Sequence, residues 1–93
     1  MADGFNALQG RNSLLNIAAS VVVKKVAGIV GTLVINTAGT STAVYDCATT
    51  GAAAAGTLIG TFTAVGIYKL KFPALVGITV IVTGGSVSSL SFD

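Results

Sequence analysis

The stretch Gly-Ile-Tyr-Lys-Leu-Lys-Phe, which ends at Phe72, constrains the fold of this chain more than any other segment. Its large apolar and cationic side chains alternate strictly: Tyr68, Leu70 and Phe72 are interleaved with Lys69 and Lys71. An extended backbone places the three apolar groups on one face and the two ammonium groups on the other, whereas a helix would scatter them around its axis. The pattern therefore predicts a half-buried β-strand, whose apolar face a second layer must cover.

Similar short segments rich in β-branched residues recur along the chain, separated by glycine or small-residue turns. We expect strands at residues 20–24, 29–36, 42–46, 57–63, 66–72, 77–83 and 87–92. In the fourth of these, alternation predicts that Leu58 and Phe62 share one face while Ile59 lies on the other. Gly84-Gly85 is the signal of a two-residue β-hairpin. Seven or eight such strands predict an all-β fold, a compact antiparallel β-sandwich of jelly-roll-like form.

The first nineteen residues differ from the rest because polar residues are mixed with isolated apolar ones and no periodicity is sustained. We divide the chain into an N-terminal arm or leading strand at residues 1–19 and a β-sandwich domain at residues 20–93. Two interpretations of the arm stay open. It is either a frayed terminus or a segment that docks on a neighbouring subunit.

Charged residues make up only 9% of the 93-residue chain, against roughly 25% in an ordinary soluble domain. The mean hydropathy of +0.89 does not predict a membrane helix, because Lys24 and Lys25 lie at the centre of the best apolar run, residues 14–35. No secretory signal is expected, and a net charge of +2 is too small to indicate nucleic-acid binding. A single cysteine, Cys47, cannot form an internal disulfide. Association with other subunits is therefore the expected source of additional stability for so small a core.

The side-chain inventory excludes most catalytic chemistry, since the chain has no histidine and no glutamate. Asp46 is the one acid within the strand pattern, and we expect it to cap a turn by accepting backbone N–H bonds. Cys47 beside it is expected to be a buried or loop thiol rather than a nucleophile. The segment from Gly51 to Gly56 has the outline of a phosphate loop but lacks the lysine, so a plain loop is the better interpretation. We expect no catalytic residue, no cofactor and no metal site.

The lysines admit two interpretations. Lys69 and Lys71, with Lys24 and Lys25 nearby, would form a basic stripe that docks on an acidic protein surface. Alternatively, they are solvated charges that protect an edge strand from unwanted pairing, and we favour this second interpretation.

The sequence resembles small virion proteins of tailed bacteriophages, of the capsid decoration or cement type. The resemblance covers roughly residues 21–92 and depends on a rhythm of strands and turns: Gly-Thr-Leu-Val-Ile-Asn-Thr-Ala-Gly at 31–39, Ala-Val-Tyr-Asp at 43–46, Gly-Thr-Leu-Ile at 56–59, Gly-Ile-Tyr at 66–68 and Gly-Ile-Thr-Val-Ile-Val-Thr-Gly-Gly at 77–85. It implies a β-sandwich on the outside of the head that clamps neighbouring major capsid subunits and carries no catalytic or cofactor residues. This chain departs from the pattern in Cys47 and in its long arm, which fits a tail or neck component equally well.

We therefore expect a non-enzymatic virion structural protein on the capsid surface, present in the host cytoplasm during assembly. Its expected partners are the major capsid protein and copies of itself, with no nucleic acid, membrane or small-molecule substrate. The expected partner-binding residues are apolar or cationic: Phe5, Leu8, Arg11, Leu14, Leu15, Lys69 and Lys71. The alternative is a tail, neck or host-recognition module that binds glycans, which would require exposed aromatic rings. An enzyme is the third option and the one with least support.

Overall fold

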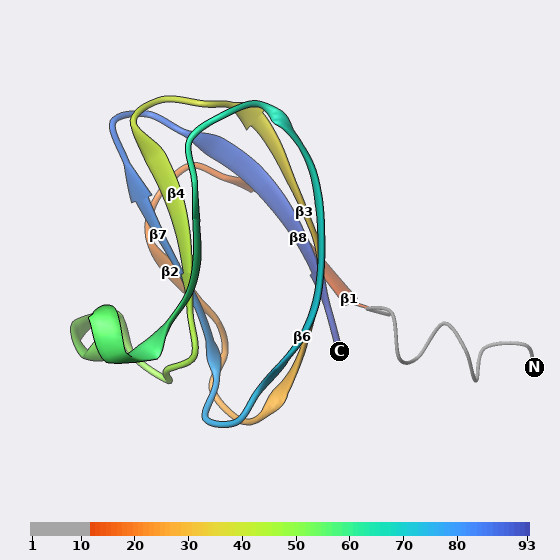
Figure 1. The fold of residues 1–93 in the computed structure, drawn as a ribbon, viewed down its shortest axis with the longest axis vertical. Coiled ribbons are helices and arrows are strands. Elements are labelled where there is room, and N and C mark those ends of the chain that lie inside the picture. Colours follow the sequence, from red (N-terminus) through yellow and green to blue (C-terminus); the bar gives the residue numbers. More distant parts are fainter. Residues whose placement is uncertain (1–11) are drawn as a thin grey trace, which may run out of the picture.

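The computed structural model describes residues 12–93, which form a two-layer β-sandwich (Figure 1). The predicted all-β sandwich is thereby confirmed. The strands are β1 (Asn12–Ile17), β2 (Val21–Lys24), β3 (Gly28–Thr37), β4 (Ser41–Tyr45), β5 (Leu58–Phe62), β6 (Gly66–Ala74), β7 (Ile78–Thr83) and β8 (Val87–Phe92). Two short 3₁₀ turns, η1 (Thr50–Ala52) and η2 (Ala55–Thr57), lie between β4 and β5.

The strands form two four-stranded antiparallel sheets. Sheet A has the order β1-β8-β3-β6, and sheet B has the order β2-β7-β4-β5. The first four strands pair with the last four in reverse order: β1 with β8, β2 with β7, β3 with β6 and β4 with β5. The described chain is thus one long antiparallel hairpin, closed at the β4–β5 connection and wrapped across both sheets. Further pairings of β3 with β8 and β4 with β7 join the two halves within each sheet.

The core lies between the sheets, and its buried members come from six of the eight strands. Its buried members are Ile17, Val30, Leu33, Ile35, Val44, Ala74, Ile78, Val80 and Leu90. Burying one such aliphatic side chain stabilises the fold by about 1.5–3 kcal/mol. Ile17 is only 4% exposed, so the strand β1 that carries it is an integral part of the sandwich although it lies within residues 1–19.

A β-bulge in β6 corrects the side-chain pattern predicted for this strand. Tyr68 and Leu70 pack against the core as predicted. The pairing with β3 then shifts register beside Lys71, whose φ is +46°, and Phe72 is left 47% exposed. The prediction that Phe72 faces the core was therefore wrong, because a bulge adds a residue and breaks the two-residue period.

A register shift in β5 also breaks the predicted alternation of buried and exposed side chains. Its pairing with β4 slips between Val44 and Tyr45. As a result Ile59 and Phe62 both pack against the core, while Leu58 is 43% exposed. The prediction of a shared face for Leu58 and Phe62 was wrong.

The turn at Gly84-Gly85 exists, but it does not close a hairpin. Both glycines have positive φ, +66° and +81°, which glycine adopts without steric cost. The turn carries the chain from β7 in sheet B to β8 in sheet A, and these two strands do not pair. The hairpin prediction was wrong because the turn signal specifies a reversal of the chain and leaves the choice of partner strand open.

Candidate interaction surface

The predicted partner-binding residues that the structure describes lie on two opposite edges of sheet A. Leu14 and Leu15 are on β1, and Lys69 and Lys71 are on β6. Phe5, Leu8 and Arg11 lie outside the described residues. Three strand spacings of about 4.8 Å separate the two edges, about 14 Å in all. The structure therefore does not gather these residues into one patch, and their role in partner binding stays a prediction.

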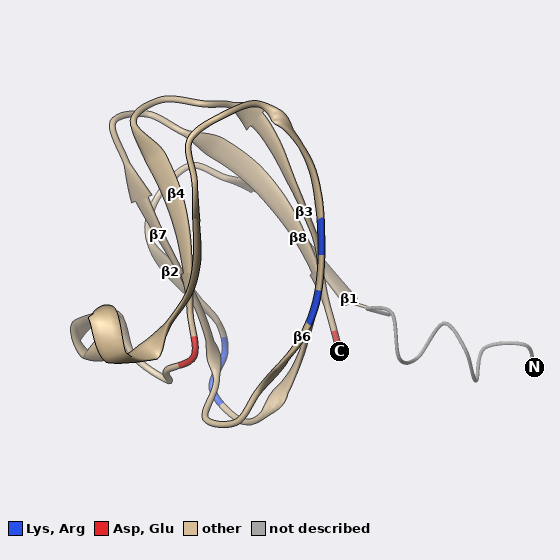
Figure 2. Ribbon diagram, in the orientation of Figure 1, with Lys and Arg blue, Asp and Glu red and all other residues tan. Residues whose placement is uncertain are grey.

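Between these two edges, sheet A presents an outer face that is weakly charged and partly apolar. Leu15 and Ile67 are 66% and 68% exposed, and Val34 lies between them, directly opposite Ile67 on β6 and Ser89 on β8. A hollow of about 180 Å³ on this face is lined by Ser13, Leu15, Thr32, Val34, Ser89, Leu90 and Ser91. Lys69 and Lys71 are the only charged residues in the four strands of sheet A (Figure 2). We call this surface the outer face of sheet A.

The two edges of sheet A differ in how well they resist further pairing. β6 carries Lys69, Lys71 and Pro73 as well as its bulge, and each of these features discourages strand addition. The location of both lysines on an edge strand agrees with the interpretation that they protect it. β1 has no charged residue and no proline, and its one irregularity is a bulge at Asn16, with φ +55°. Among the described strands, none pairs with the outer side of β1, so this is the less protected edge.

Beside β1, the flank of the sandwich is open. A hollow of about 400 Å³ is lined by residues 14–21, which form β1 and its connection to β2. Leu14, which lies opposite the buried Leu90 of β8, is 37% exposed at this flank. We call this region the β1–β2 flank.

Sequence reasoning missed a second apolar site at the end of the molecule. A hollow of about 330 Å³, which we call the end groove, lies between β5, β6 and the loop from β6 to β7. It is lined by Asp46, Gly56, Thr57, Leu58, Ile59, Phe72, Leu75 and Val76. Leu75 and Val76 are 77% and 55% exposed. Two large apolar residues between the strands predicted at 66–72 and 77–83, Leu75 and Val76, were the signal in the sequence that could have located it.

One carboxylate orders the loop of the end groove. Asp46, directly after β4, accepts the backbone N–H groups of Leu75, Val76 and Gly77 at 3.0, 2.8 and 3.2 Å. These bonds, that from Leu75 foremost, hold the pKa of Asp46 below its ordinary value although partial burial acts the other way. The prediction that Asp46 caps a turn is confirmed.

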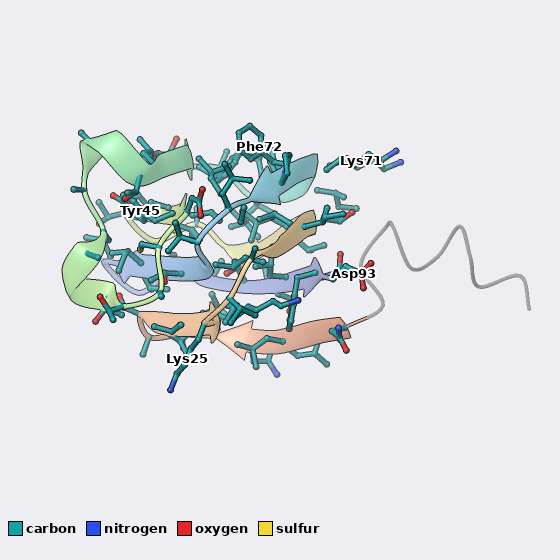
Figure 3. All side chains as sticks on the ribbon, turned by 90° about the horizontal axis from the view of Figure 1, so that it is seen from below. Lys25, Tyr45, Lys71, Phe72 and Asp93 are labelled. Atoms are coloured by element: carbon teal, nitrogen blue, oxygen red, sulfur yellow. The ribbon has the colours of Figure 1, made fainter. Side chains whose placement is uncertain are left out.

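Lys25, directly after β2, lies far from Lys71 of β6. Figure 3 shows Lys25 and Lys71 at opposite corners of the molecule, as expected for residues beside edge strands on opposite flanks. Lys24 Nζ donates a hydrogen bond of 2.9 Å to the backbone oxygen of Asp93. Lys25 therefore does not share with Lys71 the single basic stripe that was considered from the sequence.

The remaining reactive groups are placed for structural roles. Cys47 is 2% exposed and its Sγ donates to the Thr49 carbonyl at 3.2 Å, so the thiol is buried as predicted. Within residues 12–93, no three histidine, cysteine or acidic side chains lie together as metal ligands would. No helix in this same part of the chain has the length and apolar character to cross a bilayer.

The aromatic side chains are mostly turned inward. The rings of Phe62 and Tyr68 lie 4.7 Å apart, and the Tyr68 hydroxyl donates to the Ala64 carbonyl at 2.8 Å. Among the described aromatic residues, Phe72 is exposed and the other four are half-buried. A flat aromatic platform of the kind that stacks on sugar rings is therefore not formed by residues 12–93.

No protein-family model matches the chain, and neither a curated protein nor a solved structure shows significant similarity to it.

Proposed function

We propose that this protein is a non-enzymatic structural protein of a tailed-phage virion, which docks on the outside of the capsid and bridges neighbouring major capsid subunits. The observation that carries the proposal is the outer face of sheet A. Its apolar side chains, Leu15 and Ile67, are exposed, and the only charges in its strands are on β6. A protein with such a surface is expected to associate with a partner and not to remain a free monomer.

The strand order supports the same class of function by analogy. We infer that the sandwich is a jelly roll, because a long hairpin wrapped across two four-stranded sheets is the arrangement that defines this fold. Jelly rolls recur in viral capsid proteins and also in lectins. A fold hosts many functions, so this analogy raises the expectation of a virion role without assigning a partner.

In the proposed mechanism, sheet A lies on the capsid and covers a junction between two subunits. An interface of standard size buries roughly 1,600 Å², and apolar area contributes about 25 cal/mol per Å² before the costs of association are subtracted. The unprotected edge of β1 and the β1–β2 flank would extend this contact. A modest gain at each junction, repeated over the shell, would then resist the pressure of the packaged genome.

The proposal is tested with the paired substitution Leu15→Asp and Ile67→Asp. Both side chains are about two-thirds exposed, so the fold should tolerate the change, which unfolding by urea would verify. Two buried carboxylates in the interface should reduce binding to capsids that lack this protein by at least tenfold. Val26→Asp is the control, because Val26 is 62% exposed but lies in the β2–β3 loop and not in the outer face of sheet A. Equal binding by the paired variant and the control would contradict the proposal.

A further inference from the structure

We propose that two copies of this protein form a dimer in which their β1 strands pair with each other, antiparallel and centred on Leu14. Sheet A then continues from one copy into the other as a single sheet of twice the width. This inference goes beyond the proposed function, and each can fail without the other, because the dimer forms in solution without a capsid. Where both hold, the edge of β1 extends the capsid contact by joining the outer faces of two copies.

The hydrogen bonds at the end of sheet A establish which way the backbone groups of β8 point. Ile29 and Asp93 exchange two backbone hydrogen bonds, of 3.0 and 2.8 Å, so the backbone groups of Asp93 point toward β3. Along a strand these groups alternate in direction from one residue to the next. The backbone groups of Phe92 and Leu90 therefore point the other way, toward β1.

The residues of β1 opposite these two are Asn12 and Leu14, which direct their own N–H and C=O groups inward to β8. By the same alternation, Ser13 and Leu15 direct theirs to the open edge. A second β1 strand, antiparallel and centred on Leu14, places its Leu15 opposite Ser13 and its Ser13 opposite Leu15. Each of these two pairs can exchange both of its backbone hydrogen bonds. The edge of β1 is therefore complementary to itself.

The side chains of β1 and of the β1–β2 flank suit the same pairing. The strand has no charged residue, so a two-fold axis brings no like charges together. Leu14, 37% exposed, meets its equivalent in the second copy. The pairing also keeps sheet B of both copies on one side of the joined sheet, so the two flanks face each other. Their lining, residues 14–21, is uncharged, and each flank covers the other.

The opposite edge of sheet A explains why the assembly stops at two copies. Addition of β1 to β6 of another copy would also continue sheet A, but as an open chain of copies with no end. β6 discourages this addition through its bulge and through Lys69, Lys71 and Pro73. Pairing of β1 with β1 is symmetric and leaves no free β1 edge. The two edges together therefore specify a closed dimer.

Single cysteines in the full-length chain test this register. The two Cα atoms at position 14 should lie about 4.5 Å apart, which a disulfide can span. Those at position 15 are offset by two residues along each strand and should lie about 9 Å apart, beyond the reach of a disulfide. Under mild oxidation we expect Leu14→Cys to form disulfide-linked dimers at least fivefold faster than Leu15→Cys, measured by intact mass without reductant. The wild type, with only the buried Cys47, gives the background.

Exposure alone predicts the reverse order, since Leu15 is 66% exposed and Leu14 is 37% exposed. Equal rates, or faster cross-linking of Leu15→Cys, would therefore overturn the proposed pairing.

Sedimentation equilibrium gives an independent readout that needs no cysteine. The wild type should reach a mass of about twice the 9.2 kDa of the chain. Ser13→Pro removes an outward N–H group and should raise the dissociation constant of the dimer at least tenfold. The matched control, Ser13→Ala, keeps that group and should dimerise like the wild type.

A wild-type monomer up to millimolar concentration, or equal dissociation constants for the two Ser13 variants, would overturn the proposal. Capsid binding separates the remaining occupant of this edge. Monomers whose capsid binding is lost in Ser13→Pro and kept in Ser13→Ala would show that a strand of a capsid subunit, and not a second copy, pairs with β1.

Discussion

The Asp46 carboxylate accepts the backbone N–H of Val76 at 2.8 Å, thirty positions away along the chain. This bond joins the end of β4 in sheet B to the loop that leaves β6 in sheet A. It therefore fixes the two sheets relative to each other at the end of the sandwich where Leu75 and Val76 are exposed.

Asp46 should make the stability of the protein sensitive to acid. Its pKa is lowered in the folded state by the N–H bonds from Leu75, Val76 and Gly77. The stabilisation is therefore complete above the ordinary pKa of about 4 and is lost as the pH falls through the lower, folded value. We expect Asp46→Ala to lower the free energy of unfolding by about 1–2 kcal/mol at neutral pH. The difference from the wild type should shrink toward pH 2.

Urea unfolding of both proteins at several pH values measures this difference. The remaining acids, Asp3 and Asp93, are present in both chains, so their contributions largely cancel in the comparison. A difference that stays constant from pH 7 to pH 2 would show that the Asp46 charge contributes nothing.

Three glycine positions should respond to alanine in a graded way. Gly39 has a φ of +55°, and a Cβ there would collide with the backbone at Ser86 and Gly84. Gly85 has a φ of +81° but open space around it, and Gly56 has open space and no positive φ. Strain at positive φ costs about 1–2 kcal/mol, and overpacking adds about 1–3 kcal/mol.

Gly39→Ala should therefore lose roughly 2–4 kcal/mol of stability, Gly85→Ala about 1–2 kcal/mol, and Gly56→Ala close to nothing. Thermal unfolding of the three variants measures the order. Equal losses at Gly39 and Gly85 would mean that the contact between the β3–β4 and β7–β8 turns is unimportant.

Ser88 is a position where removing a polar group should stabilise the fold. Its side chain is completely buried, and Oγ has no hydrogen-bond partner among the described residues. Burying an unpaired hydroxyl costs about 1–3 kcal/mol, so Ser88→Ala should raise the denaturant midpoint. Thr42→Val is the contrasting variant, since the Thr42 hydroxyl donates to Ser86 Oγ at 2.8 Å, and it should lower the midpoint. A loss of stability in Ser88→Ala would indicate that a bound water satisfies this hydroxyl.

Truncation should separate the N-terminal residues into two parts. Removal of residues 1–11 should leave the β-sandwich intact, because the buried core of the described residues is formed by positions 17–90. Removal of residues 1–19 also deletes β1 and the buried Ile17, and loss of one such aliphatic side chain alone costs about 2–5 kcal/mol. Far-ultraviolet circular dichroism and urea unfolding distinguish the two outcomes. A stable fold after the longer deletion would mean that β1 is dispensable.

Much of the fold could be predicted from the period of the apolar residues. Alternation located β6 and placed Tyr68 and Leu70 on the core. It failed at Phe72 and Ile59, because a bulge depends on contacts with the partner strand and leaves no mark on the sequence. Strand order was equally out of reach, since the pairing of β1 with β8 joins the two ends of the described chain.

Only the low charge and apolar character of the candidate surface could be predicted from the sequence, and not its position on the fold. Low charge predicted a surface that associates with other subunits, and this stays a prediction. The structure places Leu15 on that surface, 66% exposed. The prediction treated Leu14 and Leu15 as part of an arm because the strand they form has only six residues and no clear alternation. Ile67, Leu75 and Val76 were overlooked because exposure depends on which side of a sheet or loop a residue occupies.

The copy number of this protein in purified phage particles tests the proposed function most directly. Quantitative mass spectrometry would measure it relative to the major capsid protein. A protein that bridges capsid subunits should be present in hundreds of copies, in a fixed ratio to those subunits. Absence from the particle would contradict a virion role, and a handful of copies would contradict the capsid location and indicate a tail or neck component instead.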